Sequence, residues 1–164
     1  MKIDAVDFFY LAMPTIEDVG DGSQDALLVR IAAGEWVGWG ECEAAPLVTI
    51  ASMICPMSHS ACKPVLASVL GAPLDSPQDI ARIHQAVHLS SMDLLQADHA
   101  LSGIDIALWD VLGQRYQEPV WKLLGDARPY PKTPYASMLF GDDPQATLVK
   151  CRAIAAKGFR VVKL

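Results

Sequence analysis

Residues 102–113 have the sequence Ser102-Gly103-Ile104-Asp105-Ile106-Ala107-Leu108-Trp109-Asp110-Val111-Leu112-Gly113, and this stretch decides the fold of the 164-residue chain. Apolar side chains in and beside it recur every three or four positions, which places them on one face of a helix. They are Leu101, Ile104, Leu108, Val111 and Leu112. The pattern predicts a long helix, from about Leu95 to Tyr116, that packs this face against a core.

The two aspartates of this helix do not form a carboxylate pair of the kind that acid–base catalysis uses. Asp105 and Asp110 are five residues apart, which is about 500° of helix rotation, so their side chains point roughly 140° apart. We therefore interpret both as structural residues that cap or bridge to loops. Trp109 and Trp121 are most simply aromatic residues of the core or of a domain interface.

Helical patterns extend on both sides of the central helix, over residues 46–124 as a whole. Before it, one helix is expected at 61–70 and another at 76–89. Ser76 is a typical N-cap for the second, because Pro77 follows at the first helical position. After it, a short helix is expected at 120–124 and stops at a glycine.

The N-terminal third has the pattern of a sheet. Residues 2–11, 25–33 and 36–43 are rich in β-branched and aromatic residues, which predicts three strands. Gly34-Glu35 separates the last two strands as a tight turn, so we expect an antiparallel meander. The segment 13–24 between the first two strands contains Pro, Gly, Asp and Ser, and is expected to be a long, mobile loop.

The C-terminal part predicts one strand–helix–strand unit. A linker at 128–132 is followed by a strand at 133–139, a helix at 142–157 and a strand at 159–164. Such a unit requires a parallel sheet, which needs more strands and cover on both faces. A complete barrel takes about 250 residues, whereas this unit has about 36, from 129 to 164. We therefore expect the chain to be the front part of a larger α/β protein.

Composition excludes several classes of partner. The chain is 52% hydrophobic with a mean hydropathy of +0.25, a net charge of −6 and a pI near 5.0. It has no basic stripe, so nucleic acid and anionic membranes are poor partners. We expect no signal peptide and no membrane-spanning segment, and we expect four free thiols in a reducing cytoplasm. The high apolar content predicts a surface that faces a further segment or a partner subunit.

Two groups of possible metal ligands are interpreted as structural. Cys55, His59 and Cys62 provide three of the four ligands that a structural zinc site needs, and no partner pair has the usual spacing. His84 and His88 lie one helical turn apart, but the glutamate of the zinc-protease motif is absent, so they are expected to be a surface pair. The chain also has no glycine-rich phosphate loop and no nucleophile elbow.

Three stretches of the chain resemble the enolase superfamily, in its mandelate racemase and muconate lactonizing branch. The first is GWGECE at 38–43. The second is SGIDIALWDVLG at 102–113 with its sequel PVWKLLG at 119–125, and the third is KGFRVVK at 157–163. The second is highly specific, and together the three span nearly the whole chain in the order of the family.

The resemblance implies an α+β capping domain, a three-stranded antiparallel meander plus a helical bundle, over residues 1–128. Residues 129–164 would be the first βαβ of a truncated (β/α)8 barrel. Members of the family bind Mg²⁺ through acidic residues of later barrel strands, which places the metal ligands beyond residue 164 and none in this chain. They abstract a proton α to a carboxylate and form homo-oligomers, commonly through the capping region.

The implied activity therefore belongs to a longer parent protein, and the 164-residue chain alone is expected to be inactive. Among the chemistries of the family we favour the dehydration of a sugar acid, a small carboxylic-acid substrate. Racemisation and cycloisomerisation are the alternatives within the family. A different alternative is a non-catalytic binding or assembly module made of the capping domain alone.

Lys163 is the single catalytic candidate. Phe159, Val161 and Lys163 share one face of the last predicted strand, and in a barrel this face would point inward. Lys163 would then lie near the C-terminal mouth, where active sites of such barrels are found. By the resemblance it matches the first of two lysines that end this strand and usually assists electrostatically. The alternative is an ordinary strand-end lysine on the surface.

Two segments correspond to the substrate lids of the family. The first is the loop at 13–24 and the second is the segment at 44–60. Thr15, Ser58 and His59 are polar residues of these segments that are candidates to contact a polyhydroxy acid. For each of them, the alternative is a solvated loop residue.

Overall fold

The structure is a computed structural model that describes residues 1–18, 24–42, 45–138 and 143–163. Parts of the predicted segments lie outside this description. They are residues 19–23 of the predicted loop, Glu43 and Leu139 at predicted strand ends, Ala44 at the start of the second predicted lid segment, Asp142 at a predicted helix start, and Leu164 at the end of the last predicted strand.

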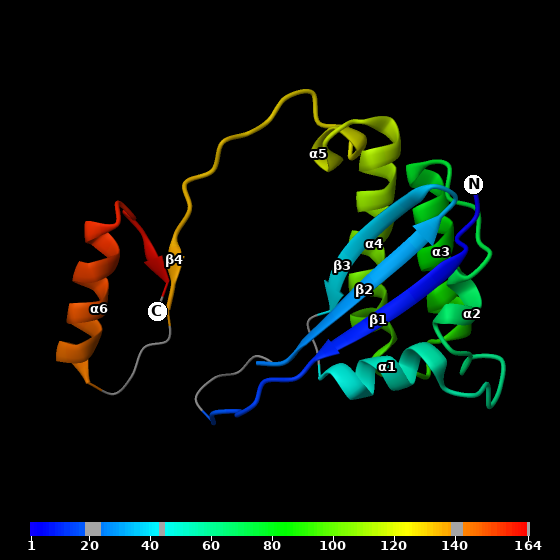
Figure 1. Cartoon of the computed structure of the whole chain (residues 1–164), viewed down its shortest axis with the longest axis horizontal. Coiled ribbons are helices and arrows are strands. Elements are labelled where there is room, and N and C mark those ends of the chain that lie inside the picture. The colour runs from blue at the N-terminus through cyan, green and yellow to red at the C-terminus, as the bar shows by residue number, and fades with distance from the viewer. Residues whose placement is uncertain (19–23, 43–44, 139–142, 164) are drawn as a thin grey trace. The chain divides into compact units, whose positions relative to one another are not determined.

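The chain divides into two compact units, Met1–Ala127 and Arg128–Leu164, and each is described by itself. The first unit contains a three-stranded sheet and five helices among the residues described, and the second contains two short strands and one helix (Figure 1).

The sheet of the first unit is the predicted antiparallel meander. Its strands β1 (Ala5–Leu11), β2 (Ala26–Ala33) and β3 (Trp36–Cys42) lie in the order β1-β2-β3. Gly34 has a φ of +61° and forms the hairpin turn between the last two strands. Alternate residues of β2 are fully buried and form one face of the core: Leu27, Val29, Ile31 and Ala33.

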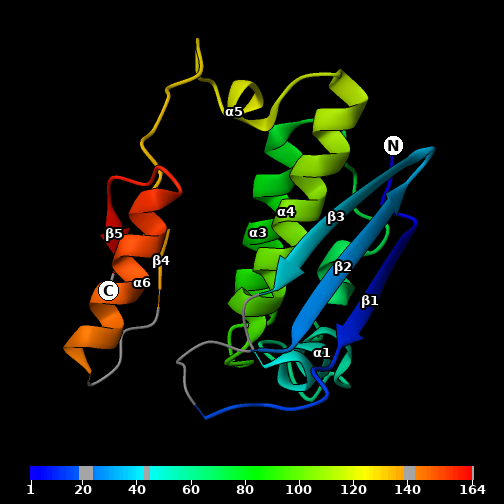
Figure 2. The same ribbon diagram turned by 60° about the vertical axis from the view of Figure 1, so that its left-hand side comes forward.

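Helices cover this buried face of the sheet (Figure 2). The long helix α4 (Ala97–Tyr116) packs against β3 and β2, and α3 (Pro77–Ser90) lies beside it. The predicted apolar face of α4 is buried as expected, at Leu101, Ile104, Leu108, Val111 and Leu112. The shorter helices are α1 (Pro46–Ile54), α2 (Leu66–Val69) and α5 (Val120–Leu123).

The start of α3 confirms the N-cap predicted at Ser76. The carboxylate of Asp79 accepts hydrogen bonds from the backbone N–H groups of Asp75 and Ser76, both at 2.9 Å, and from the Ser76 hydroxyl at 3.0 Å. Arg82 donates to the other carboxylate oxygen at 2.6 Å. These bonds, led by the backbone N–H of Asp75, hold the pKa of the Asp79 carboxyl below its usual value.

The helix predicted at residues 61–70 is wrong for most of its length, because only Leu66–Val69 is helical. The backbone before it makes long-range hydrogen bonds and a tight turn instead of helical hydrogen bonds. The N–H of Lys63 donates to the carbonyl of Ser90, and the N–H of Val65 donates to that of Ser52. These distant partners satisfy the backbone in a non-helical conformation, which a local apolar pattern does not reveal.

Helix α4 crosses β3 at backbone contact, and glycines make this approach possible. A Cβ atom on Gly40 would lie 2.0 Å from the carbonyl oxygen of Gly103, and one on Gly38 would lie 2.2 Å from that of Ala107. In the opposite direction, a Cβ on Gly103 would lie 2.4 Å from the sulfur of Cys42. Every one of these separations is a steric clash, so no larger residue fits without moving the helix from the sheet.

Polar bonds fix the same crossing at its exposed side. The carboxylate of Asp110 accepts from the backbone N–H of Trp39 at 2.9 Å, and the Gln114 amide donates to the carbonyl of Val37 at 2.8 Å. The N–H of Trp39 and the carbonyl of Val37 belong to β3, which is an edge strand of the sheet. Without Asp110 and Gln114, these two backbone groups would lack protein partners on this side. Asp110 is therefore a structural residue, as predicted.

The second unit contains the predicted strand–helix–strand with parallel strands. β4 (Ala136–Ser137) pairs with β5 (Val162–Lys163), and α6 (Pro144–Ala156) connects them. Both strands are shorter than the sequence pattern suggested. Asp143 caps α6 by accepting from the backbone N–H of Gln145 at 2.8 Å.

Two further expectations concern the whole chain. All four cysteines are free, and burial raises the pKa of the Cys42 thiol to about 11. Among the residues described, no helix combines the length and the apolar character needed to cross a bilayer.

The glycine contact generates a stability prediction. We expect Gly103→Ala to lower the free energy of unfolding by about 2–3 kcal/mol, because the new methyl group overpacks the sulfur and backbone of Cys42. Gly113→Ala in the same helix is the matched control, since its Cβ would approach the Glu118 carbonyl no closer than 3.2 Å. It is expected to change stability by less than about 1 kcal/mol.

Urea denaturation followed by tryptophan fluorescence measures both changes. This signal reports on the first unit, because it holds all four tryptophans of the chain: Trp36, Trp39, Trp109 and Trp121. Equal midpoints for the two variants would contradict the close approach of α4 to β3.

Candidate functional site

The loop between β1 and β2 is closed at its base by Asp25. Its carboxylate accepts from the Tyr10 hydroxyl at 2.5 Å and from the backbone N–H of Met13 at 2.7 Å. Further along, Gln24 and Glu17 exchange two hydrogen bonds between the amide side chain and the backbone. The described part of the first lid segment is thus tied across its stem.

The hydrogen bond between Tyr10 and Asp25 shifts the pKa values of the two groups in opposite directions. The hydrogen bond from Tyr10, followed by that from Met13, lowers the pKa of the Asp25 carboxyl. The same bond to Asp25 is the main cause that raises the pKa of the Tyr10 hydroxyl. The stem is therefore held in the state with a carboxylate and a neutral phenol.

Two of the predicted lid residues are brought together, and one is not. Thr15 is an exposed residue of the segment that follows β1, whereas Ser58 and His59 lie in the segment after α1. In Figure 1 the first of these segments continues from the end of β1, whereas the second leaves from the C-terminal end of α1. Within the first unit, the structure therefore separates Thr15 from the neighbouring pair Ser58 and His59.

Ser58 and His59 form a hydrogen-bonded chain with Asp93. The hydroxyl of Ser58 lies 2.8 Å from Nδ1 of His59, and Nε2 of the same ring lies 2.6 Å from a carboxylate oxygen of Asp93. The backbone N–H of Cys62 donates to the carbonyl of His59 and closes a tight turn, from which the imidazole ring of His59 projects. Sequence reasoning missed Asp93 because it is 34 residues away from His59 and belongs to no recognisable motif.

The cysteines and histidine near this turn do not form a metal site. Both ring nitrogens of His59 already have hydrogen-bond partners. Across the described ranges, no group of three or more His, Cys, Asp or Glu side chains is placed to hold a metal ion.

The other histidine pair connects two helices. His84 on α3 lies 2.8 Å from the carboxylate of Asp105 on α4, and His88 lies 3.5 Å from that of Asp98. The His84 side chain is 36% exposed, so it is only partly a surface residue. Asp105 thus bridges to a neighbouring element, which agrees with its structural interpretation.

Lys163 ends β5 in the second unit. Its carbonyl accepts from the backbone N–H of Met138 at 3.2 Å, which continues the pairing with the strand end of β4. Val161 and Lys163 are exposed, whereas Val162 between them is half-buried. The predicted alternation of faces is therefore present, and the face that carries Lys163 is uncovered within this unit.

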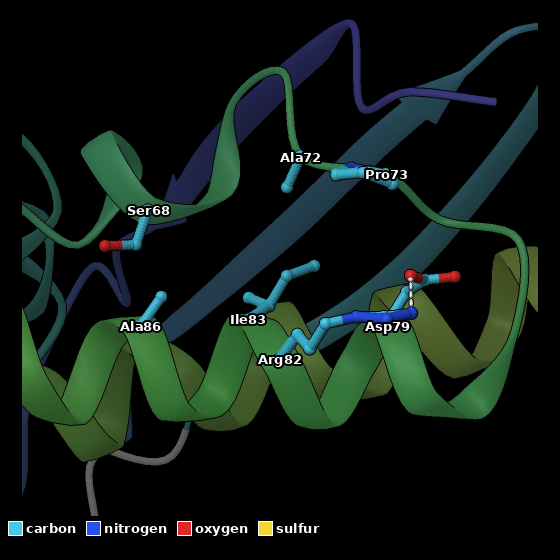
Figure 3. A pocket seen from close by; sticks show the side chains of 7 residues that line it. All are labelled: Ser68, Ala72, Pro73, Asp79, Arg82, Ile83 and Ala86. Atoms are coloured by element: carbon cyan, nitrogen blue, oxygen red, sulfur yellow. Dashed lines mark hydrogen bonds and ion pairs between the residues drawn. The ribbon is translucent and has the colours of Figure 1, made fainter.

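A cavity of about 460 Å³ lies between α3 and the segment that follows α2 (Figure 3). Its walls are mostly apolar, and the Arg82–Asp79 ion pair lies at one end of it. None of the predicted site residues lines it; the lining residues are Ser68, Ala72, Pro73, Asp79, Arg82, Ile83 and Ala86. Within the first unit, this cavity therefore does not include the predicted lid residues Thr15, Ser58 and His59.

The architecture is that of an α+β capping domain joined to the start of a (β/α)8 barrel: a helix-covered antiparallel meander, then one parallel strand–helix–strand. Comparison with known families agrees with this class. Residues 11–125 match the model of the mandelate racemase / muconate lactonizing enzyme N-terminal domain. The chain belongs to this family, and thus to the N-terminal part of the enolase superfamily.

Similar proteins include one solved structure with high identity. A predicted mandelate racemase from Rhodobacter sphaeroides is 61% identical with a TM-score of 0.92, and the match covers 98% of this chain and 41% of that one. A D-galactonate dehydratase family member from Catenulispora acidiphila is 38% identical over 90 residues, covering 54% of this chain and 21% of the relative. A 3,6-anhydro-alpha-L-galactonate cycloisomerase from Streptomyces coelicolor is 39% identical over 69 residues, covering 42% of this chain and 19% of the relative.

The stem of the first lid segment generates a pH prediction. The pKa of Asp25 is lowered in the folded state, so its carboxylate stabilises the fold at a pH above the unfolded carboxyl pKa of about 3.9. This stabilisation is lost as the pH falls through the pKa of the folded state. We expect Asp25→Asn to abolish this acid dependence and to speed amide exchange at Met13, whose N–H loses a charged acceptor.

Hydrogen exchange followed by NMR from neutral pH down to about pH 3, below the reference carboxyl pKa, measures this effect. Asp18→Asn in the same loop removes an equal charge without touching the Tyr10–Asp25 bond. If both variants alter exchange at Met13 equally, the stem is not held by Asp25.

Proposed function

We propose that this chain is the N-terminal segment of a longer, Mg²⁺-dependent enzyme that abstracts the proton α to a carboxylate and dehydrates a sugar acid. The observation that carries this is the 38% identity to the galactonate dehydratase family member. Since that match spans about a fifth of the relative, and the chain covers 41% of the solved structure from Rhodobacter sphaeroides, the activity is assigned to the whole protein. The 164-residue chain alone is expected to give no turnover of sugar acids.

Racemisation or cycloisomerisation of a carboxylic acid is the second candidate. It is supported by the relatives that carry these names. Both activities begin with the same proton abstraction, so the two candidates differ in what happens to the resulting anion.

Lys163 is proposed to assist electrostatically. Active sites of such barrels lie at the carboxyl ends of the strands, and Lys163 ends β5. An ammonium group at that position stabilises the negative charge that develops when the substrate loses its α proton. The residue that takes the proton is proposed to lie outside residues 1–164.

The described residues do not fit a magnesium site. Mg²⁺ prefers an octahedral set of oxygen ligands, usually carboxylates and waters. The described part of the chain provides no cluster of acidic side chains of this kind. We therefore assign the ligands to the rest of the protein and derive no chemical step through the ion.

The lid residues are proposed to contact the hydroxyl groups of the substrate. Thr15 and Ser58 are exposed and carry hydroxyls that both donate and accept hydrogen bonds. His59 is less suited to direct contact through a ring nitrogen, because such a contact would displace Ser58 or Asp93.

A second copy of the chain is proposed as the macromolecular partner, in a cytoplasmic enzyme. The exposed face of the sheet carries a tilted aromatic pair, Phe9 and Trp39, with ring centroids 5.4 Å apart. Both side chains are more than 40% exposed, and exposed aromatic groups of this kind are typical of interfaces. The net charge of −6 supports a partner other than nucleic acid or an anionic membrane.

The assignment is tested with the full-length protein and the 164-residue chain side by side. Each is incubated with Mg²⁺ and a panel of sugar acids, and 2-oxo-3-deoxy acids are detected as semicarbazones. We expect product with the full-length protein and none with the chain. Epimerised or lactonised substrate without oxo acid would favour the second candidate, and no reaction with any acid would favour a non-catalytic module.

Lys163→Ala in the full-length protein is expected to lower kcat about 10²–10³-fold, the usual loss when one electrostatic stabiliser of a transition state is removed. Lys157→Ala, in the turn before β5, is the matched control and should leave kcat near its original value. If both variants have the same kcat, Lys163 is an ordinary surface lysine.

A further inference from the structure

The hydrogen-bonded chain Ser58–His59–Asp93 has the connectivity of an activated nucleophile. Its hydroxyl-to-ring distance of 2.8 Å and its ring-to-carboxylate distance of 2.6 Å both lie within the range for a nucleophile, a base and the group that orients the base. The family assignment does not use these three residues as a unit, so their arrangement needs a separate explanation.

The partners of His59 determine which nitrogen carries the proton in the neutral ring. An ionised carboxylate only accepts hydrogen bonds, so Nε2 must donate to Asp93. Nδ1 is then the unprotonated nitrogen and accepts from the Ser58 hydroxyl. The free lone pair of the imidazole therefore faces the one group that could be deprotonated during attack.

The same three side chains are accessible. The side chains of His59 and Asp93 are 54% and 52% exposed, and Ser58 is exposed as well. A small reagent can therefore reach the Ser58 oxygen without any rearrangement of the core.

We propose that Ser58 is a nucleophile that accepts acyl groups from activated esters. Ser58 Oγ forms a bond to the acyl carbon while its proton passes to Nδ1 of His59. The C–O bond to the alcohol then breaks, and that alcohol leaves with the proton from His59. Water, deprotonated by the same nitrogen, later hydrolyses the serine ester and releases the carboxylic acid.

The geometry also limits the substrate class. A positioned general base contributes about 10²–10⁴-fold to the rate, whereas the larger contribution of an oxyanion hole requires free N–H donors. The backbone N–H of Ser58 already donates to the carbonyl of Cys62 at 3.2 Å. Ser58 is therefore suited to esters with good leaving groups, such as phenyl esters, and not to amides.

The test exposes the 164-residue chain to p-nitrophenyl acetate, followed by an acid quench and peptide mapping by mass spectrometry. Ser60 is the internal control, since it is an exposed serine two residues away in the same turn. We expect acetylation of Ser58 at least about 10²-fold faster than that of Ser60. His59→Gln should reduce the Ser58 rate to that of Ser60, and Asp93→Asn should reduce it by a factor of ten or more.

Circular dichroism and urea midpoints of both variants establish that they remain folded, as expected for exposed residues. The chain of hydrogen bonds has a purely structural role if Ser58 and Ser60 react at the same rate. The same conclusion follows if folded His59→Gln protein is acetylated at Ser58 as fast as the original chain.

Discussion

The first unit depends on the contact between the backbones of α4 and β3. Three glycines on these two elements remove the side chains that would hold them apart: Gly38, Gly40 and Gly103. The resulting approach lets the apolar face of α4 reach the buried residues of β2, and it brings Asp110 within hydrogen-bond distance of the β3 backbone. The specific stretch at 102–113 is therefore a packing motif: it supplies small residues, apolar residues and aspartates at the positions where the helix meets its neighbours.

Local patterns predicted the elements whose structure is fixed by local chemistry. The apolar spacing of α4, the Ser76 cap of α3 and the Gly34 turn of the meander all follow from residues close together in sequence. Residues 61–65 could not be predicted in this way, because the N–H groups of Lys63 and Val65 donate to the distant carbonyls of Ser90 and Ser52. The pattern placed a helix there since it contained no information about these distant partners.

The candidate site shows the same division between local and distant information. Thr15, Ser58, His59 and Lys163 were identified from their segments and from a family resemblance, and their roles in the chemistry remain predictions. Asp93 was not identified, because only the folded turn brings it to the ring of His59. Its carboxylate accepts from Nε2 of that ring, which orients the ring and leaves Nδ1 to accept from the Ser58 hydroxyl.

The approach of Gly40 to Gly103 is most directly measured by NMR. We predict strong nuclear Overhauser effects between the Hα protons of these two glycines, and from Gly40 Hα to the amide proton of Ala107, because the backbones are in van der Waals contact. Their absence from an otherwise folded and assigned spectrum would contradict this packing and, with it, the arrangement of helices on the sheet.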